Sequence, residues 1–108
     1  MSVLKEIYEK DTLVVTAAFY DDASAAVTPT SATYRIHDKA SGTIIKAVTT
    51  LTGLGTTKAI EVTSAENALV NANDNAEEHI LTLAFDYGAS RHGSATYRWV
   101  VKGLEGVA

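Results

Sequence analysis

The sequence predicts an all-β protein in which about seven short strands form a two-layered sandwich. Apolar and polar residues alternate over several short runs, which is the period-two pattern of strands that bury one face. These runs recur at roughly ten-residue spacing and are separated by clusters of Gly, Asn, Asp and Ser. Val, Ile and Thr are frequent, and such β-branched side chains favour the pleated surface of a sheet. The three observations together favour strands along nearly the whole chain.

The composition of the chain limits its class. It has 108 residues, of which 46% are hydrophobic, so we expect a single domain over residues 1–108 with a frayed tail at residues 103–108. The absence of cysteine excludes disulfides and thiolate zinc sites. A formal net charge of −4 without a basic stripe argues against a nucleic-acid partner. No apolar run is long enough to span a membrane and no signal peptide is evident. We therefore expect no membrane partner, and either folding in a reducing cytoplasm or a leader that has been trimmed from the chain.

The clearest strands are the last two, at residues 79–87 and 94–102. A polar connector with a glycine at each end joins them, so they are expected to form an antiparallel hairpin. Placing both apolar faces on one side requires paired residues whose numbers have an even sum. Leu83 opposite Trp99 is the simplest such register, and it puts the single tryptophan in the core, where its truncation should cost roughly 3–5 kcal/mol.

Five further strands are expected upstream, at residues 3–8, 13–20, 32–38, 43–50 and 58–63. The run at 13–20 is apolar on both parities, as expected for a strand inside a sheet. Residues 21–31 are expected to form a loop, because Pro29 cannot donate a hydrogen bond to a ladder. Gly42 falls in a turn where a positive φ is expected.

One helical candidate interrupts the strands. Residues 64–70 could form one or two helical turns, with Ser64 as the cap, and the polar loop of residues 71–78 then leads into the final hairpin. About seven strands with one short helical turn between the fifth and sixth predict an immunoglobulin- or fibronectin-like β-sandwich. A small closed barrel is the competing architecture.

The loop of residues 71–78 is the best candidate for a ligand site, because oxygen-bearing side chains alternate in it as calcium ligands do in a calcium-binding loop. The pattern departs from such a loop in detail. Ala76 stands where a glycine is needed, Thr82 stands in place of the bidentate glutamate, and the leading residue is the neutral Asn71. A solvated turn is the favoured interpretation, and whether this loop binds calcium is left open.

No catalytic constellation is evident in the sequence. Ser90 and His92 lie in a segment similar to the G-x-S-x-G nucleophile motif, but a histidine replaces the last glycine and a hairpin replaces the required strand-to-helix turn. The glycine-containing stretch of residues 53–58 lacks the spacing of a P-loop. The histidines and acids are scattered along the chain. We therefore expect no enzyme, and we assign no catalytic, cofactor-binding or metal-binding residue.

The order of several hairpin segments resembles that in a known class of protein. The segment YRIHD (residues 34–38) is followed by SGTII (residues 41–45), and later by the strand IEV (residues 60–62), an Asn-rich loop and paired last strands that carry Tyr97. This succession resembles the small immunoglobulin-like structural proteins of tailed bacteriophage particles. The resemblance implies a non-enzymatic virion protein, a capsid decoration, head–tail or tail component, that is assembled in the host cytoplasm.

Such a protein would dock on other virion proteins or on copies of itself, and a homo-oligomer is one outcome of that docking. The expected contacts are the strand edges at residues 3–8 and 43–50 and the loops at residues 21–31 and 71–78. The alternative is a recognition module of the same fold that binds glycans or a receptor through Tyr20, Tyr87 and the loops between them.

Overall fold

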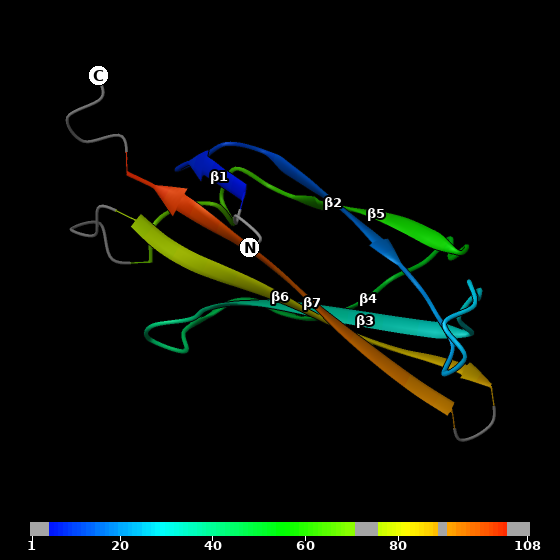
Figure 1. Ribbon diagram of the computed structural model, residues 1–108. Coiled ribbons are helices and arrows are strands. Elements are labelled where there is room, and N and C mark those ends of the chain that lie inside the picture. Colours follow the sequence, from blue (N-terminus) through cyan, green and yellow to red (C-terminus); the bar gives the residue numbers. More distant parts are fainter. Residues whose placement is uncertain (1–4, 71–75, 89–90, 104–108) are drawn as a thin grey trace.

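The computed structural model describes residues 5–70, 76–88 and 91–103, and these form an all-β structure of two sheets. The larger sheet has five strands in the order β1-β7-β6-β3-β4, and the smaller sheet pairs β2 with β5 (Figure 1). The prediction of a two-layered sandwich is confirmed at this level, and the two separate sheets do not form a closed barrel. The seven strands are β1 (Lys5–Tyr8), β2 (Leu13–Ala18), β3 (Ser31–Asp38), β4 (Ile44–Thr50), β5 (Thr57–Val62), β6 (Ala76–Gly88) and β7 (Arg91–Lys102).

The long hairpin of β6 and β7 forms the centre of the larger sheet, as the sequence predicted, but its register differs from the predicted one. Trp99 lies opposite His79, and Leu83 lies opposite Ala95. The parity is preserved, because both sums are even, so the apolar face still points inward. The register shifts because β6 continues to Gly88 and β7 begins at Arg91, which leaves a connector shorter than the sequence suggested.

The shifted register places Phe85 opposite Gly93. A Cβ atom built on Gly93 would lie 2.7 Å from Cε2 of Phe85, so the ring covers the space that any larger residue would need. Phe85 also meets the ring of Phe19 edge-to-face, with the two centroids 5.0 Å apart. This aromatic pair closes the core at the end of the sandwich near the hairpin tip.

Strand β1 joins the larger sheet beside β7 in parallel, with Lys5 opposite Trp99. The other pairings in both sheets are antiparallel. The predicted edge at residues 3–8 is therefore confirmed over Lys5–Tyr8, whereas residues 3 and 4 lie outside the described part of the chain. At the opposite edge, β4 pairs only with β3, through a register that shifts twice between Tyr34 and His37.

The core lies between the two sheets and contains buried apolar side chains from every strand except β4. Trp99 is 1% exposed, which confirms that the single tryptophan belongs to the core. Ile60 and Val62 of β5 are also buried, and the two residues share a parity within the strand. Gly42 has a φ of 74° in the β3–β4 turn, as predicted for this position.

Two local predictions are wrong. The run at residues 13–20 was expected inside a sheet, but β2 has a single neighbour, β5. The apolar residues on the second face of this strand are not buried, because Val14 is 56% exposed. The helical candidate at residues 64–70 forms turns, and the described residues contain no helix.

The segment after β5 begins with a helix cap, but the turn is not continued. Thr63 rather than Ser64 starts the segment: the Thr63 N–H donates to Oε1 of Glu66 at 2.9 Å, and the Glu66 N–H donates to Oγ1 of Thr63 at 3.4 Å. These reciprocal contacts are those of a capping box, one residue earlier than predicted. Asn67 follows and turns inward to bind other strands, so the turn is not continued as a helix.

Several predictions concern residues at the margin of the described chain. The loop predicted at residues 71–78 ends earlier, because Ala76, Glu77 and Glu78 already belong to β6. The oxygen-bearing residues that alternate in this loop are Asn71, Asn73, Asn75 and Glu77, and the first three lie in residues 71–75, outside the described residues. Of the predicted tail at residues 103–108, only Gly103 is described. A search of the described residues for helices finds none that is long and apolar enough to cross a membrane.

Candidate functional site

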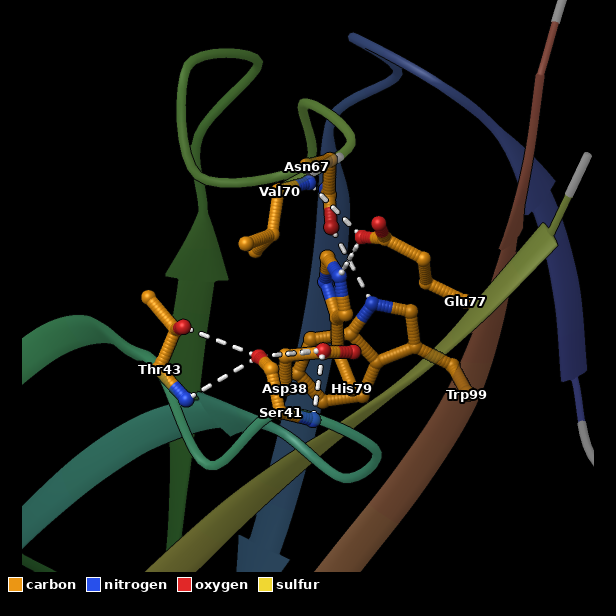
Figure 2. A network of polar contacts seen from close by, with 8 residues as sticks. All are labelled: Asp38, Ser41, Thr43, Asn67, Val70, Glu77, His79 and Trp99. Atoms are coloured by element: carbon orange, nitrogen blue, oxygen red, sulfur yellow. Dashed lines mark hydrogen bonds and ion pairs between the residues drawn. The ribbon is translucent and has the colours of Figure 1, made fainter. Parts of the chain in front are cut away.

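A cluster of buried polar side chains lies at one end of the core, where the β3–β4 turn, the start of β6 and the turn after β5 converge (Figure 2). It contains the four buried polar or charged residues among those described, which are Asp38, Asn67, Glu77 and His79. Because polar groups are rarely buried without a specific role, this cluster is the first candidate for a functional site.

Strand register brings the cluster together. Asp38, the last residue of β3, pairs with His79 of β6, and His79 pairs with Trp99 of β7. The three side chains therefore form one row across the inner face of the larger sheet. Glu77 precedes His79 by two residues and so points to the same face of β6. All four positions thus follow from the pleat of the strands.

The imidazole of His79 is held from one side by Glu77. Nε2 of His79 lies 3.0 Å from Oε1 of Glu77, and the same oxygen accepts the N–H of Val70 at 2.7 Å. The side chains of Glu77 and His79 are 2% and 0% exposed. The ring also meets Trp99 edge-to-face, with the centroids 6.3 Å apart. Packing and hydrogen bonding together fix the orientation of His79.

Asp38 is held by the turn that follows β3. Its Oδ2 accepts the backbone N–H of Ser41 at 3.1 Å and the Ser41 hydroxyl at 2.7 Å. Its Oδ1 is buried and makes no hydrogen bond with a described residue, and the same is true of Nδ1 of His79. Donor atoms of Asp38, Glu77 and His79 lie within 4.8 Å of one another, so these residues could hold a metal ion.

Asn67 closes the cluster from the smaller sheet. Its Oδ1 accepts the indole N–H of Trp99 at 3.0 Å, and its Nδ2 donates to the carbonyls of Asp11 at 2.7 Å and Val62 at 3.4 Å. The backbone carbonyl of Asn67 accepts the backbone N–H of Lys10 at 3.0 Å. One fully buried amide thus links the β1–β2 turn, β5 and β7.

Sequence reasoning left these residues apart, as scattered acids and histidines. The signal that could have found them is the extension of the period-two pattern. Asp38 shares its parity with Tyr34 and Ile36, and His79 shares its parity with Leu81, so both were inward positions of predicted strands. A polar residue at an inward position predicts a buried polar contact.

The second candidate site is the exposed edge of the larger sheet at β4. Ile44 is 52% and Val48 is 67% exposed on this strand. Its one charged residue, Lys46, forms an ion pair with Glu66, with 3.2 Å between Nζ and Oε2. The hydrogen bond and charge of Glu66 raise the pKa of Lys46. The predicted edge at residues 43–50 is confirmed over Ile44–Thr50.

The other edges differ from β4 in their charges. On β1, Lys5 and Glu6 carry charge, and Glu6 pairs with Lys102 at 3.1 Å. On β5, Lys58 and Glu61 also carry charge. The remaining edge strand, β2, has no charged residue and carries the exposed Val14. Charged edges resist pairing with other strands, so β4 and β2 are the edges open to it.

The hairpin tip holds an acid–histidine pair that sequence reasoning missed. His92 lies opposite Asp86 in the ladder, and its Nδ1 hydrogen-bonds to Oδ1 of Asp86. Ser31 donates to the other oxygen of Asp86 at 3.0 Å. The hydrogen bond from His92, followed by that from Ser31, lowers the pKa of Asp86.

This pair does not complete a catalytic arrangement within the described residues. Ser90 lies outside them, and no described hydroxyl hydrogen-bonds to His92. The side chains of His92 and Asp86 are 73% and 46% exposed, so solvent surrounds them. The register that unites the two residues depends on the length of the turn, which is why the sequence did not reveal the pair.

The predicted aromatic binding surface is only partly exposed. Tyr20 is 55% exposed, but Tyr87 is partly buried and packs against Phe85 with a centroid distance of 6.0 Å. In the loop of residues 21–31, Oδ1 of Asp21 accepts the N–H groups of Ala23 at 2.9 Å and Ala25 at 3.0 Å. These contacts stabilise the loop itself.

Comparisons of the chain with protein-family models, with curated proteins and with solved structures found no match.

Proposed function

We propose that this chain is a non-enzymatic structural protein of a tailed phage or prophage particle, and that it docks on another particle protein through the edge of β4. The proposal rests on the hairpin pattern that resembles such proteins and on the chemistry of the β4 edge. It places the protein in the virion after assembly in the host cytoplasm.

The strand order supports an immunoglobulin-like assignment of the sandwich. In the variable-type plan, one sheet contains strands G, F, C and C′, and the facing sheet contains B and E. The order β7-β6-β3-β4 facing β2–β5 corresponds to this plan, with β1 added beside β7. Such sandwiches serve many unrelated roles, so the function has to be argued from a site.

The observation that carries the docking proposal is the state of β4. It is an edge strand of seven residues with two exposed aliphatic side chains, Ile44 and Val48, and its only charge is engaged by Glu66. An edge strand presents unpaired backbone N–H and C=O groups, and long apolar edges are normally protected by charge. An edge left open in this way is suited to accept a strand from a partner, with main-chain hydrogen bonds for affinity and side chains for specificity.

The outer face next to this edge suits close approach of a partner. Val48 borders a shallow hollow of about 260 Å³ that is also lined by Thr33, Tyr34, Arg35, Thr82 and Ala84. Three of these five side chains are small, so a partner whose strand pairs with β4 could also contact the outer face of the sheet. We therefore expect the partner to cover β4 and the neighbouring part of β3.

Val48→Lys tests this proposal, with Val14→Lys as its matched control. Both valines are exposed on edge strands, at 67% and 56%, but they lie on different sheets. The assay is co-sedimentation of the purified protein with particles of the phage or prophage that encodes it. We expect wild-type protein and V14K to bind, and V48K to bind at least about tenfold more weakly, a loss of about 1.4 kcal/mol.

The proposal is contradicted if the protein is missing from purified particles and does not bind them, or if V48K binds as well as wild type. Size-exclusion chromatography with light scattering then tells whether the partner is a second copy, because self-association would disappear in V48K alone. Specific binding on a glycan array, unaffected by V48K, would support the alternative recognition module instead.

A further inference from the structure

We propose that Asp38 and His79 form a buried binding site for one divalent transition-metal ion of the Zn²⁺ class, with Glu77 as the positioning residue that orients His79. The site lies inside the sandwich and uses neither of the exposed β4 side chains, Ile44 and Val48, so the inference stands independently of the docking proposal.

Two buried acceptor atoms define the site. Oε1 of Glu77 can only accept hydrogen bonds as a carboxylate oxygen, so the 3.0 Å contact assigns the imidazole proton to Nε2 of His79. In this tautomer the lone pair lies on Nδ1. Both Nδ1 of His79 and Oδ1 of Asp38 are buried and lack a hydrogen-bond partner among the described residues. Two acceptors cannot satisfy each other, whereas a cation bound between them satisfies both.

The second polar atom of each ligand is already engaged, as is usual at metal sites. Nε2 of His79 faces a carboxylate, and Oδ2 of Asp38 accepts two hydrogen bonds from Ser41. A carboxylate bound to the far nitrogen of a histidine fixes the ring and raises its basicity toward the metal. In Figure 2 the ring of His79 lies between Glu77 on one side and Asp38 on the other.

The donor set selects the class of ion. Ca²⁺ and Mg²⁺ take oxygen ligands, so an imidazole nitrogen as one of the two ligands disfavours them. Imidazole with carboxylate suits Zn²⁺ and its neighbours in the first transition row. The carboxylates of Asp38 and Glu77 supply negative charge to balance a divalent ion.

The spacing is compatible with a modest adjustment. Donor atoms in the cluster lie within 4.8 Å of one another. Zinc–ligand distances of about 2.0–2.2 Å place neighbouring donors roughly 3.4 Å apart in a tetrahedral site. Donors separated by up to 4.8 Å therefore have to approach one another to close around an ion, and rotation of the Asp38 carboxylate is one movement that brings them closer.

An open hollow lies next to the cluster. It has a volume of about 390 Å³ and is lined by Lys39, Ala40, Ala76, Glu77 and Glu78, so Glu77 belongs both to the hollow and to the cluster. Two protein ligands leave coordination positions of the ion open, which makes a site of moderate affinity the expected outcome.

The test is a titration of the full, EDTA-treated chain with ZnCl₂, followed by isothermal titration calorimetry and thermal unfolding. We expect one equivalent of Zn²⁺ to bind and the unfolding midpoint to rise with zinc concentration, because the ligand binds only the folded state. The fluorescence of Trp99 should change on binding, since its ring contacts His79. CaCl₂ and MgCl₂ at equal concentration should not change the midpoint.

Variants separate this site from adventitious binding. D38N and H79Q should abolish the zinc effect, and E77Q should weaken binding by about 10- to 100-fold, as expected for a positioning carboxylate. H92Q is the matched control, because it removes the exposed histidine of the Asp86–His92 pair and should leave binding unchanged. Circular dichroism of each variant verifies the fold.

The inference is overturned if wild-type protein shows neither heat nor a midpoint shift up to millimolar zinc. It is equally overturned if H92Q loses binding while H79Q keeps it, or if Ca²⁺ raises the midpoint more than Zn²⁺ does. Should H79Q fail to fold, Co²⁺ added to wild-type protein decides the matter. Visible absorption bands of Co²⁺ bound to a nitrogen ligand, lost when one equivalent of Zn²⁺ displaces the Co²⁺, support the site. The absence of such bands contradicts it.

Discussion

Asn67→Ala is the substitution from which we expect the most informative loss of stability. Asn67 is fully buried, and its amide satisfies the indole N–H of Trp99 at 3.0 Å and the carbonyl of Asp11 at 2.7 Å. Alanine would leave both groups without a partner in a site that water reaches poorly. Each of the two unsatisfied groups costs about 1–3 kcal/mol, so the free energy of unfolding should fall by about 2–6 kcal/mol.

This loss is large for a chain of this size, whose free energy of unfolding should be about 5–16 kcal/mol. Urea unfolding followed by far-ultraviolet circular dichroism measures it, because that signal does not depend on Trp99. In a Trp99→Phe background the indole N–H is gone, so Asn67→Ala should cost about 1–2 kcal/mol less there. A loss below about 1 kcal/mol, or an equal loss in both backgrounds, would refute the assigned role of Asn67.

Three further predictions concern the long hairpin. Gly93→Val should destabilise the protein by about 1–3 kcal/mol in chemical unfolding, because its Cβ would meet the ring of Phe85, and Phe85→Leu should relieve part of this cost. Trp99→Ala should cost about 3–5 kcal/mol by the same assay, and a near-neutral result would contradict its core position. A carbon-detected NMR titration should give Asp86 a pKa below the ordinary aspartate value, moving upward in His92→Ala. Because the folded pKa is depressed, the Asp86 contribution to stability is present above about pH 3.9 and is lost as the pH falls through the lower folded value. An unchanged Asp86 titration in His92→Ala would contradict this.

Much of the fold could be predicted because strand pattern and burial agree. The inward parity of residues such as Leu83 and Trp99 was correct, since it depends only on the period-two alternation. The register was wrong because it depends on the length of the turn, and Gly88 and Arg91 both turned out to belong to strands. Alternation determines which face a residue occupies, but not which residue lies opposite it.

The candidate sites were harder to predict for the same reason. Asp38 and His79 are far apart in sequence and become neighbours only through the β3–β6 register. Asn67 lay within the predicted helical segment at residues 64–70, whereas its role depends on contacts with three other segments. The edge at β4 was predicted correctly, but the ion pair that occupies Lys46 could not be read from local pattern.

The parallel pairing of β1 with β7 affects how the protein reaches its native state. The first strand of the chain has the last strand as its partner in the larger sheet, so this pairing has the longest loop to close. Contacts between distant parts of a chain slow folding. During synthesis β1 must wait, unpaired in this sheet, until β7 has left the ribosome. The step that docks β1 should therefore come late in the assembly of the larger sheet.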